Sequence, residues 1–188
     1  LSSRSASVHL ALLRDRRDNP VVPTRGNRLR ADFELANELY GSETDYQRLT
    51  FNGSYHRPLG DAWLFHAGFK HGSVFSSGSD QTEVPLNKRF FPGGENSIRG
   101  YGEGEASPRD DSGVFIGAAH YWLFNLEVER ALGPDLRLVV FADGLLQGRS
   151  EDDFPGDTWL ASVGLGLRYN TILGPLRIEY GRNVSKRN

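Results

Sequence analysis

No cysteine occurs in this chain of 188 residues. Its absence excludes disulfides, thiolate nucleophiles and thiolate metal sites, and it suits an oxidising compartment in which a stray thiol is a liability. No apolar run approaches the roughly 18 residues that a membrane helix needs, which excludes an α-helical membrane protein. The formal net charge of -2 argues against nucleic acid as a partner. No basic and apolar leader precedes Leu1, so we expect a mature portion or a piece of a longer protein.

Alternation of apolar and polar residues is the dominant pattern, and a helical period competes nowhere. The hydrophobic fraction of 38% and the mean hydropathy of -0.48 resemble those of a soluble protein. Outer-membrane barrels have the same composition, because only every second strand residue meets lipid. The strand-like segments run from Leu29 to Leu35, Leu49 to Tyr55, Trp63 to Phe69, Phe124 to Val128, Ala161 to Tyr169 and Leu176 to Tyr180, with less regular ones at Ser7 to Arg14 and Leu136 to Asp143.

The connections between these segments alternate between tight and long. In an up-and-down sheet alternate connections lie at the same end, and tight turns at one end with long loops at the other are typical of outer-membrane barrels. The tight turns are 58–61, 132–135 and 173–175, the long loops are 40–45, 76–112 and 148–157, and the longer 15–26 is an exception at the tight-turn end. With strands of about 10 to 16 residues, longer than those of most globular proteins, the sequence favours a transmembrane antiparallel β-barrel over a soluble sandwich or lipocalin-like barrel.

Charged residues occupy one face of the expected strands. Each Arg or Lys at mid-depth on a lipid face costs about 2 to 4 kcal/mol, so we expect these residues to line the lumen, most of them simply solvated. They are Arg28, Arg30, Asp32, Glu34, Glu127, Glu129, Arg168, Arg177 and Glu179.

The longest connection holds a glycine-rich stretch with one arginine at its tip, from Arg89 to Tyr101. Long loops in compact β structures usually carry function. The stretch Arg89-Phe90-Phe91-Pro92-Gly93-Gly94, followed by Ser97-Ile98-Arg99-Gly100-Tyr101, resembles the sixth extracellular loop of the BamA/TamA-type outer-membrane assembly family, also called the bacterial surface antigen family, whose hallmark is (V/I)-R-G-(F/Y).

Four further segments are similar to motifs of that family, in matching order. Phe141-Ala142-Asp143-Gly144-Leu145 keeps the carboxylate of the usual F-x-D-x-G but departs from its final glycine. The other three are Asp15 to Pro20 with Pro23 to Gly26, Asn125-Leu126-Glu127, and Gly174-Pro175-Leu176-Arg177-Ile178-Glu179-Tyr180. I-R-G-Y alone is a weak signal, whereas five ordered matches are a strong one.

The resemblance implies that residues 1–188 are a partial C-terminal barrel domain: about eight strands, the C-terminal half of a 16-stranded barrel, without POTRA repeats or the final strand. It implies that loop 76–112 folds into the lumen, where Arg99 pairs with Asp143 and Glu127. The guanidinium suits this role, since its rigid fork of donors matches carboxylates. The loop motif carried over is Arg89, Phe90, Gly93, Gly94, Ile98, Arg99, Gly100 and Tyr101. From strand count alone an independent eight-stranded barrel stays open.

The function that the resemblance implies is a non-enzymatic assembly or insertion factor in the bacterial outer membrane. Its partners would be the lipid bilayer, nascent β-barrel or autotransporter substrates and accessory subunits, with no nucleic acid, cofactor or metal. The alternatives are a two-partner secretion pore, a passive channel, or the barrel anchor of a larger enzyme. No H-E-x-x-H or G-x-S-x-G motif occurs, and we expect the acids at 103–111 and 151–153 to be solvated loop residues rather than a cation site.

Overall fold

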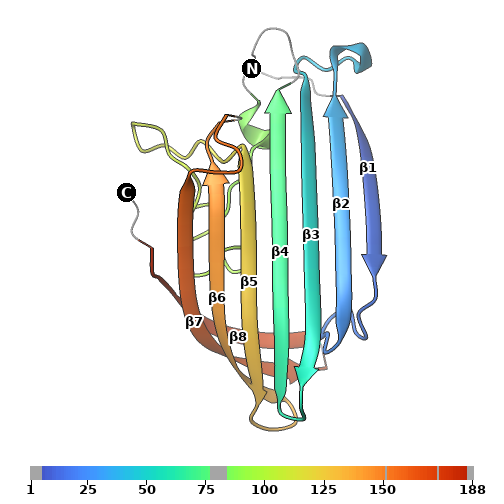
Figure 1. Cartoon of the computed structure of the whole chain (residues 1–188), viewed down its shortest axis with the longest axis vertical. Helices are drawn as coiled ribbons and strands as arrows, with labels where there is room; N and C mark the ends of the chain where they lie inside the picture. The colour runs from blue at the N-terminus through green and yellow to red at the C-terminus, as the bar shows by residue number, and fades with distance from the viewer. Residues whose placement is uncertain (1–5, 77–83, 151, 173, 186–188) are drawn as a thin grey trace.

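The computed structural model describes residues 6–76, 84–150, 152–172 and 174–185. In these residues one antiparallel sheet contains eight strands in the order of the sequence (Figure 1). The strands are β1 (Ser7–Asp15), β2 (Gly26–Ala36), β3 (Tyr46–Leu59), β4 (Trp63–Ser76), β5 (His120–Ala131), β6 (Leu136–Gly148), β7 (Thr158–Thr171) and β8 (Gly174–Asn183). Two single turns of 3-10 helix, Glu38–Tyr40 and Leu86–Lys88, lie in the connections. No helix in this described part is long and apolar enough to cross a membrane.

The sheet is an up-and-down meander with unequal ends. Figure 1 shows the turns β3–β4 and β5–β6 at one end of the strands and the long connections at the other. The predicted all-β antiparallel fold with this asymmetry is confirmed. Residues 77–83 of the predicted loop and Leu173 of the predicted turn lie outside the described residues.

Two predicted boundaries are wrong. The long loop was expected to end at Ser112, but the next strand begins only at His120, because residues up to Ala118 pair with the loop itself. Strand β6 was expected to end at Asp143 and reaches Gly148, where it still pairs with His120.

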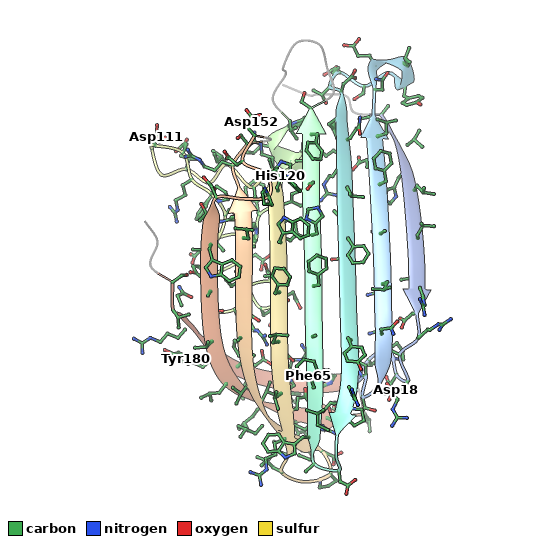
Figure 2. All side chains as sticks on the ribbon, viewed as in Figure 1. Asp18, Phe65, Asp111, His120, Asp152 and Tyr180 are labelled. Atoms are coloured by element: carbon green, nitrogen blue, oxygen red, sulfur yellow. The ribbon has the colours of Figure 1, made fainter. Side chains whose placement is uncertain are left out.

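The two faces of the sheet differ in chemistry, as the alternation predicts. The outward face exposes large apolar side chains, among them Phe124, Leu165 and Tyr180. Figure 2 shows aromatic rings spread over the outer face of β3 to β5, with Phe65 and Tyr180 labelled. The inward face carries the charged side chains predicted for a lumen, such as Glu129 and Arg168, both buried.

The sheet is open in the described residues. Pairing runs from β1 to β8 in sequence, and no ladder joins β8 to β1 there, so the eight strands do not form a closed barrel of their own. The wall is part of a larger curved surface, and what fills its inner side is the long loop. Two apolar clusters form where this loop packs on the wall, one around Phe90 and Val74 and one around Ile98 and Leu145.

Candidate functional site

The long loop lies against the inner face of the sheet and pairs with itself. Phe90 and Ala118 exchange backbone hydrogen bonds of 3.0 and 2.7 Å, and the Gly94 N–H donates to the Tyr101 carbonyl at 3.0 Å. The two strands of the loop are thereby held together before β5 begins. Part of this loop runs down behind β5 and β6 in Figure 1. The tip that it carries inward is Arg99.

Arg99 is held by Asp143 of β6 through three hydrogen bonds. Its Nε and one Nη donate to the two carboxylate oxygens at 2.8 and 2.6 Å, and its backbone N–H donates to the same carboxylate at 3.0 Å. The Arg99 side chain is 7% exposed and that of Asp143 is 0% exposed. A bidentate pair of this kind fixes orientation as well as charge.

The second Nη of Arg99 reaches two more acids. It donates to Glu127 of β5 at 2.5 Å and to Glu179 of β8 at 3.1 Å. The guanidinium carbon lies 3.5 Å from the centre of the Phe141 ring, so the flat face of the group is covered as well. One loop residue is therefore bonded to three strands of the wall, β5, β6 and β8.

A second arginine, Arg168 of β7, shares these acids. Glu127 places its other oxygen 2.8 Å from Arg168, and the Arg168 guanidinium also donates to Glu179 at 2.6 Å and to Glu129 at 2.5 Å. Glu127 and Glu179 thus bridge the two guanidinium groups. A buried charge is tolerated only when it is paired, and this alternation of two arginines with four carboxylates supplies the pairing.

Polar side chains of the wall also hold the loop backbone. The Lys70 ammonium donates to the Asn96 carbonyl at 2.5 Å. Asn125 donates to the Ser97 carbonyl at 2.9 Å and to Asp143 at 2.7 Å. The carbonyl groups before Arg99 are therefore satisfied by β4 and β5, which is what a buried loop requires.

The residues that flank Arg99 pack rather than bond. Ile98 is fully buried against Leu123, Leu145 and Leu160. Tyr101 packs on the same cluster, and its hydroxyl lies 3.3 Å from Ser185.

Gly100 takes a backbone shape that other residues resist. Its φ is +86°, and a Cβ there would lie 2.8 Å from Asn183. Gly93 and Gly94 have φ values of +137° and +85°, so the motif glycines stand where the loop turns sharply.

The start of the loop has its own anchor, on β2 and β3. Lys88 donates to Glu34 at 2.8 Å, and the Tyr46 hydroxyl donates to the same carboxylate at 2.7 Å. The Arg48 guanidinium donates to the Lys88 carbonyl at 3.1 Å and lies over the Phe90 ring. The loop is therefore attached to both halves of the wall.

The structure brings together most residues that the sequence singled out. Arg99, Asp143 and Glu127 are in direct contact, whereas Arg89 bonds elsewhere, to the Arg149 carbonyl at 3.1 Å. Sequence reasoning missed Glu179 as a partner of Arg99, although its inward parity was visible, and it missed the Lys88 anchor, for which no local signal exists.

The site offers hydrogen bonds and charge but no chemical catalysis that its residues would perform. No group of three His, Asp or Glu residues in the described part of the chain has the arrangement that holds a metal ion. Its acids are engaged with arginines, which leaves the assembly suited to holding a loop in place.

An antiparallel wall with an apolar outer face, a charged inner face and a loop pinned inside defines an outer-membrane β-barrel. The Omp85 superfamily domain matches residues 2–188. The chain therefore belongs to the Omp85 superfamily.

Three comparisons place it within that superfamily. The chain is 33% identical over 181 residues to the outer membrane protein assembly factor BamA of Nitratidesulfovibrio vulgaris, which covers 94% of this chain and 23% of that protein. The structure of BamA from Haemophilus ducreyi lacking POTRA domains 1–3 matches with a TM-score of 0.81 at 22% identity, over 96% of this chain and 39% of that one. CdiB from Acinetobacter baumannii matches with a TM-score of 0.61 at 17% identity, over 94% and 29%. The structural matches show the fold. The chain spans about a quarter of the length of the curated BamA relative.

Proposed function

We propose that this chain is part of a BamA-like assembly factor of the bacterial outer membrane, which helps β-barrel or autotransporter proteins to insert. The proposal rests on the family and on the 33% identity to a bacterial BamA. The observation that carries it is the buried contact of Arg99 with Asp143 and Glu127. The lipid bilayer, unfolded substrate chains and accessory subunits are the partners, and the action involves no cofactor and no metal.

The role of the loop in this proposal is internal bracing. Arg99 bonds to β5, β6 and β8, and Lys88 bonds to β2, so the loop connects distant parts of one wall. A wall braced in this way keeps its curvature while substrate strands pair with the protein elsewhere. Arg99 acts in this scheme as a positioning residue.

The test is insertion of a substrate in reconstituted membranes. The full-length protein is placed in liposomes, a urea-unfolded β-barrel protein is added, and folding is followed by the gel mobility of heated and unheated samples. We expect faster insertion than in empty liposomes, with a lower rate for Arg99→Ala. Arg109→Ala is the matched control, because Arg109 stacks on Phe115 within the loop and stands outside the Arg99 network. A full-length protein that works no faster than empty liposomes would refute the proposal.

A secretion pore is the second candidate, since CdiB shares the fold. A passive channel and the barrel anchor of a larger enzyme belong to the same set of alternatives. Capture experiments separate them: an insertion factor enriches many unfolded barrel chains, whereas a secretion pore enriches one dedicated exported protein. Single-channel recording adds the third outcome, because a passive channel shows steady open conductance without substrate.

A further inference from the structure

The outward face of the sheet contains a groove that the site above does not use. The groove, of about 780 Å³, crosses the face from β1 to β5. It is lined chiefly by apolar side chains with one arginine, namely Arg14, Asn27, Leu29, Phe51, Gly53, Ser54, Tyr55, Ala67, Gly68, Phe69, Phe124 and Leu126.

Aromatic rings form one wall of this outer groove, and small residues form its floor. Phe51 and Phe69 lie 5.7 Å apart by ring centres, and Phe69 and Phe124 lie 5.3 Å apart. Gly53 and Ala67 stand beside them on the same face, where larger side chains would fill the space. A Cβ on Gly53 would come only to 3.4 Å from Leu29, so the groove is open above this glycine.

The groove descends from the edge of the membrane towards its middle. Arg14 is one residue from the end of β1, whereas Phe124 lies seven residues before the end of β5. Both strands end at the tight-turn end of the sheet. At about 3.4 Å per residue the Phe124 end lies roughly 24 Å along its strand from the turn. Strands of such barrels are tilted by roughly 35 to 45°, so a groove that crosses them runs obliquely from rim to midplane.

The charge at the rim of the groove is positive and is not balanced on that face. Arg14 is exposed and points outward, since its neighbours in the ladder are Leu13 and Asp15 on the inner side. No Asp or Glu occupies an outward position in the strands that the structure describes, although Arg57 and Arg130 also face outward near their turns. A cation beside an apolar channel at a membrane surface matches a phosphate joined to an acyl chain.

We propose that this groove binds one phospholipid molecule from the leaflet at the tight-turn end. Arg14 donates hydrogen bonds to the lipid phosphate, and one acyl chain lies over Gly53 and Ala67 along the aromatic wall. The distance from rim to midplane is that of half a hydrocarbon core, about 15 Å, which is the depth an acyl chain spans. Arg57 and Arg130 lie outside the groove lining and have no part in this site.

Native mass spectrometry of the full-length protein, delipidated in detergent and supplied with phosphatidylglycerol, tests the site. We expect wild type to retain one lipid, and Arg14→Gln to bind it about tenfold more weakly, the loss of one charge-assisted hydrogen bond. Gly53→Leu should have a similar effect by filling the groove, and its backbone accepts a side chain because no positive φ is required. Arg57→Gln is the matched control, an outward arginine near a turn, and should retain the lipid. Heat-dependent gel mobility verifies that each variant is folded.

Three results would overturn the proposal. Retention by Arg14→Gln and Gly53→Leu at the wild-type level would show that the groove holds no lipid. Equal losses in Arg57→Gln and Arg14→Gln would mean that any rim arginine attracts anionic lipid. A wild-type protein that retains no phosphatidylglycerol, or that holds a protein segment in the groove, would mean that the occupant is not a phospholipid.

Discussion

The backbone of Gly100 in the long loop lies directly against the backbone of Gly181 in β8. A Cβ on Gly181 would stand 2.7 Å from the Gly100 nitrogen and 3.0 Å from the Arg99 carbonyl carbon. Only two glycines permit this approach, because any side chain at either position meets backbone atoms that cannot move aside. The approach places Arg99 within reach of Glu179, which is two residues earlier on β8.

Gly181→Ala should therefore lift the loop from the wall. Arg99 is 7% exposed, so trypsin cleaves slowly after it in the folded protein. In the variant we expect faster cleavage after Arg99, measured by mass spectrometry of the digest in detergent. Gly133→Ala is the control, since nothing lies within 4 Å of a Cβ at that turn position. Wild-type protection of Arg99 in Gly181→Ala would mean that the contact between the two glycines does not hold the loop.

Removal of Arg99 should be more costly than removal of both Arg99 and Asp143 would suggest from the single effects. Arg99→Ala leaves a buried carboxylate without its partner, which costs about 3 to 5 kcal/mol in buried pairs. Asp143→Ala leaves the arginine with Glu127 and Glu179, while the double variant removes both charges. We expect its loss of unfolding free energy to be smaller than the sum of the single losses. Urea unfolding of the full-length protein in lipid measures this, and strict additivity would argue against a coupled pair.

The two anchors of the loop should fail independently. Lys88→Gln removes the bond to Glu34, whose side chains are 25% and 16% exposed, so we expect a loss below about 1 kcal/mol. Hydrogen exchange should then rise in residues 84–92 and stay low in residues 96–106, because Arg99 still holds the tip. Arg99→Ala should give the opposite pattern. Equal exchange in both segments in either variant would show that the loop moves as one body.

The fold could be predicted from the sequence because it is written locally. Alternation placed the outward and inward residues of each strand, and turn chemistry separated the two ends of the sheet. The end of the long loop at Ser112 was wrong because residues 113–119 also look irregular, and their pairing with Phe90 is a contact across the loop. Strand β6 was drawn too short, because Gly144 and Gly148 interrupt an alternation that backbone pairing continues.

The site could be predicted only as far as the resemblance reaches. Arg99, Asp143 and Glu127 came from motifs, and geometry then adds what no motif names. Glu179 meets Arg99 because β8 curves past the loop tip at Gly181, a relation that depends on the shape of the wall. Arg168 joins the network through shared acids, and a pattern of single strands does not reveal such sharing.

The connection between β1 and β2 should depend on the ionisation of Asp18, which lies at the tight-turn end (Figure 2). Its carboxylate accepts hydrogen bonds from the Thr24 hydroxyl at 2.5 Å and from the backbone N–H groups of Thr24 and Arg25 at 2.9 and 3.0 Å. The Thr24 hydroxyl, followed by the Arg25 N–H, holds the pKa of Asp18 well below its usual range. These bonds require the charged or unprotonated carboxylate as acceptor.

A folded pKa below the unfolded value stabilises the turn above the unfolded pKa of about 3.9, and the stabilisation disappears as the pH falls through the lower folded value. Hydrogen exchange of residues 16–26, corrected for intrinsic rates, should therefore be flat from neutral pH to about 4 and should rise below it. Asp18→Asn lacks the titrating group, so its exchange should be high throughout and independent of this ionisation. If the wild type lost protection near neutral pH, or if Asp18→Asn kept the wild-type profile, the carboxylate would not be what closes this connection.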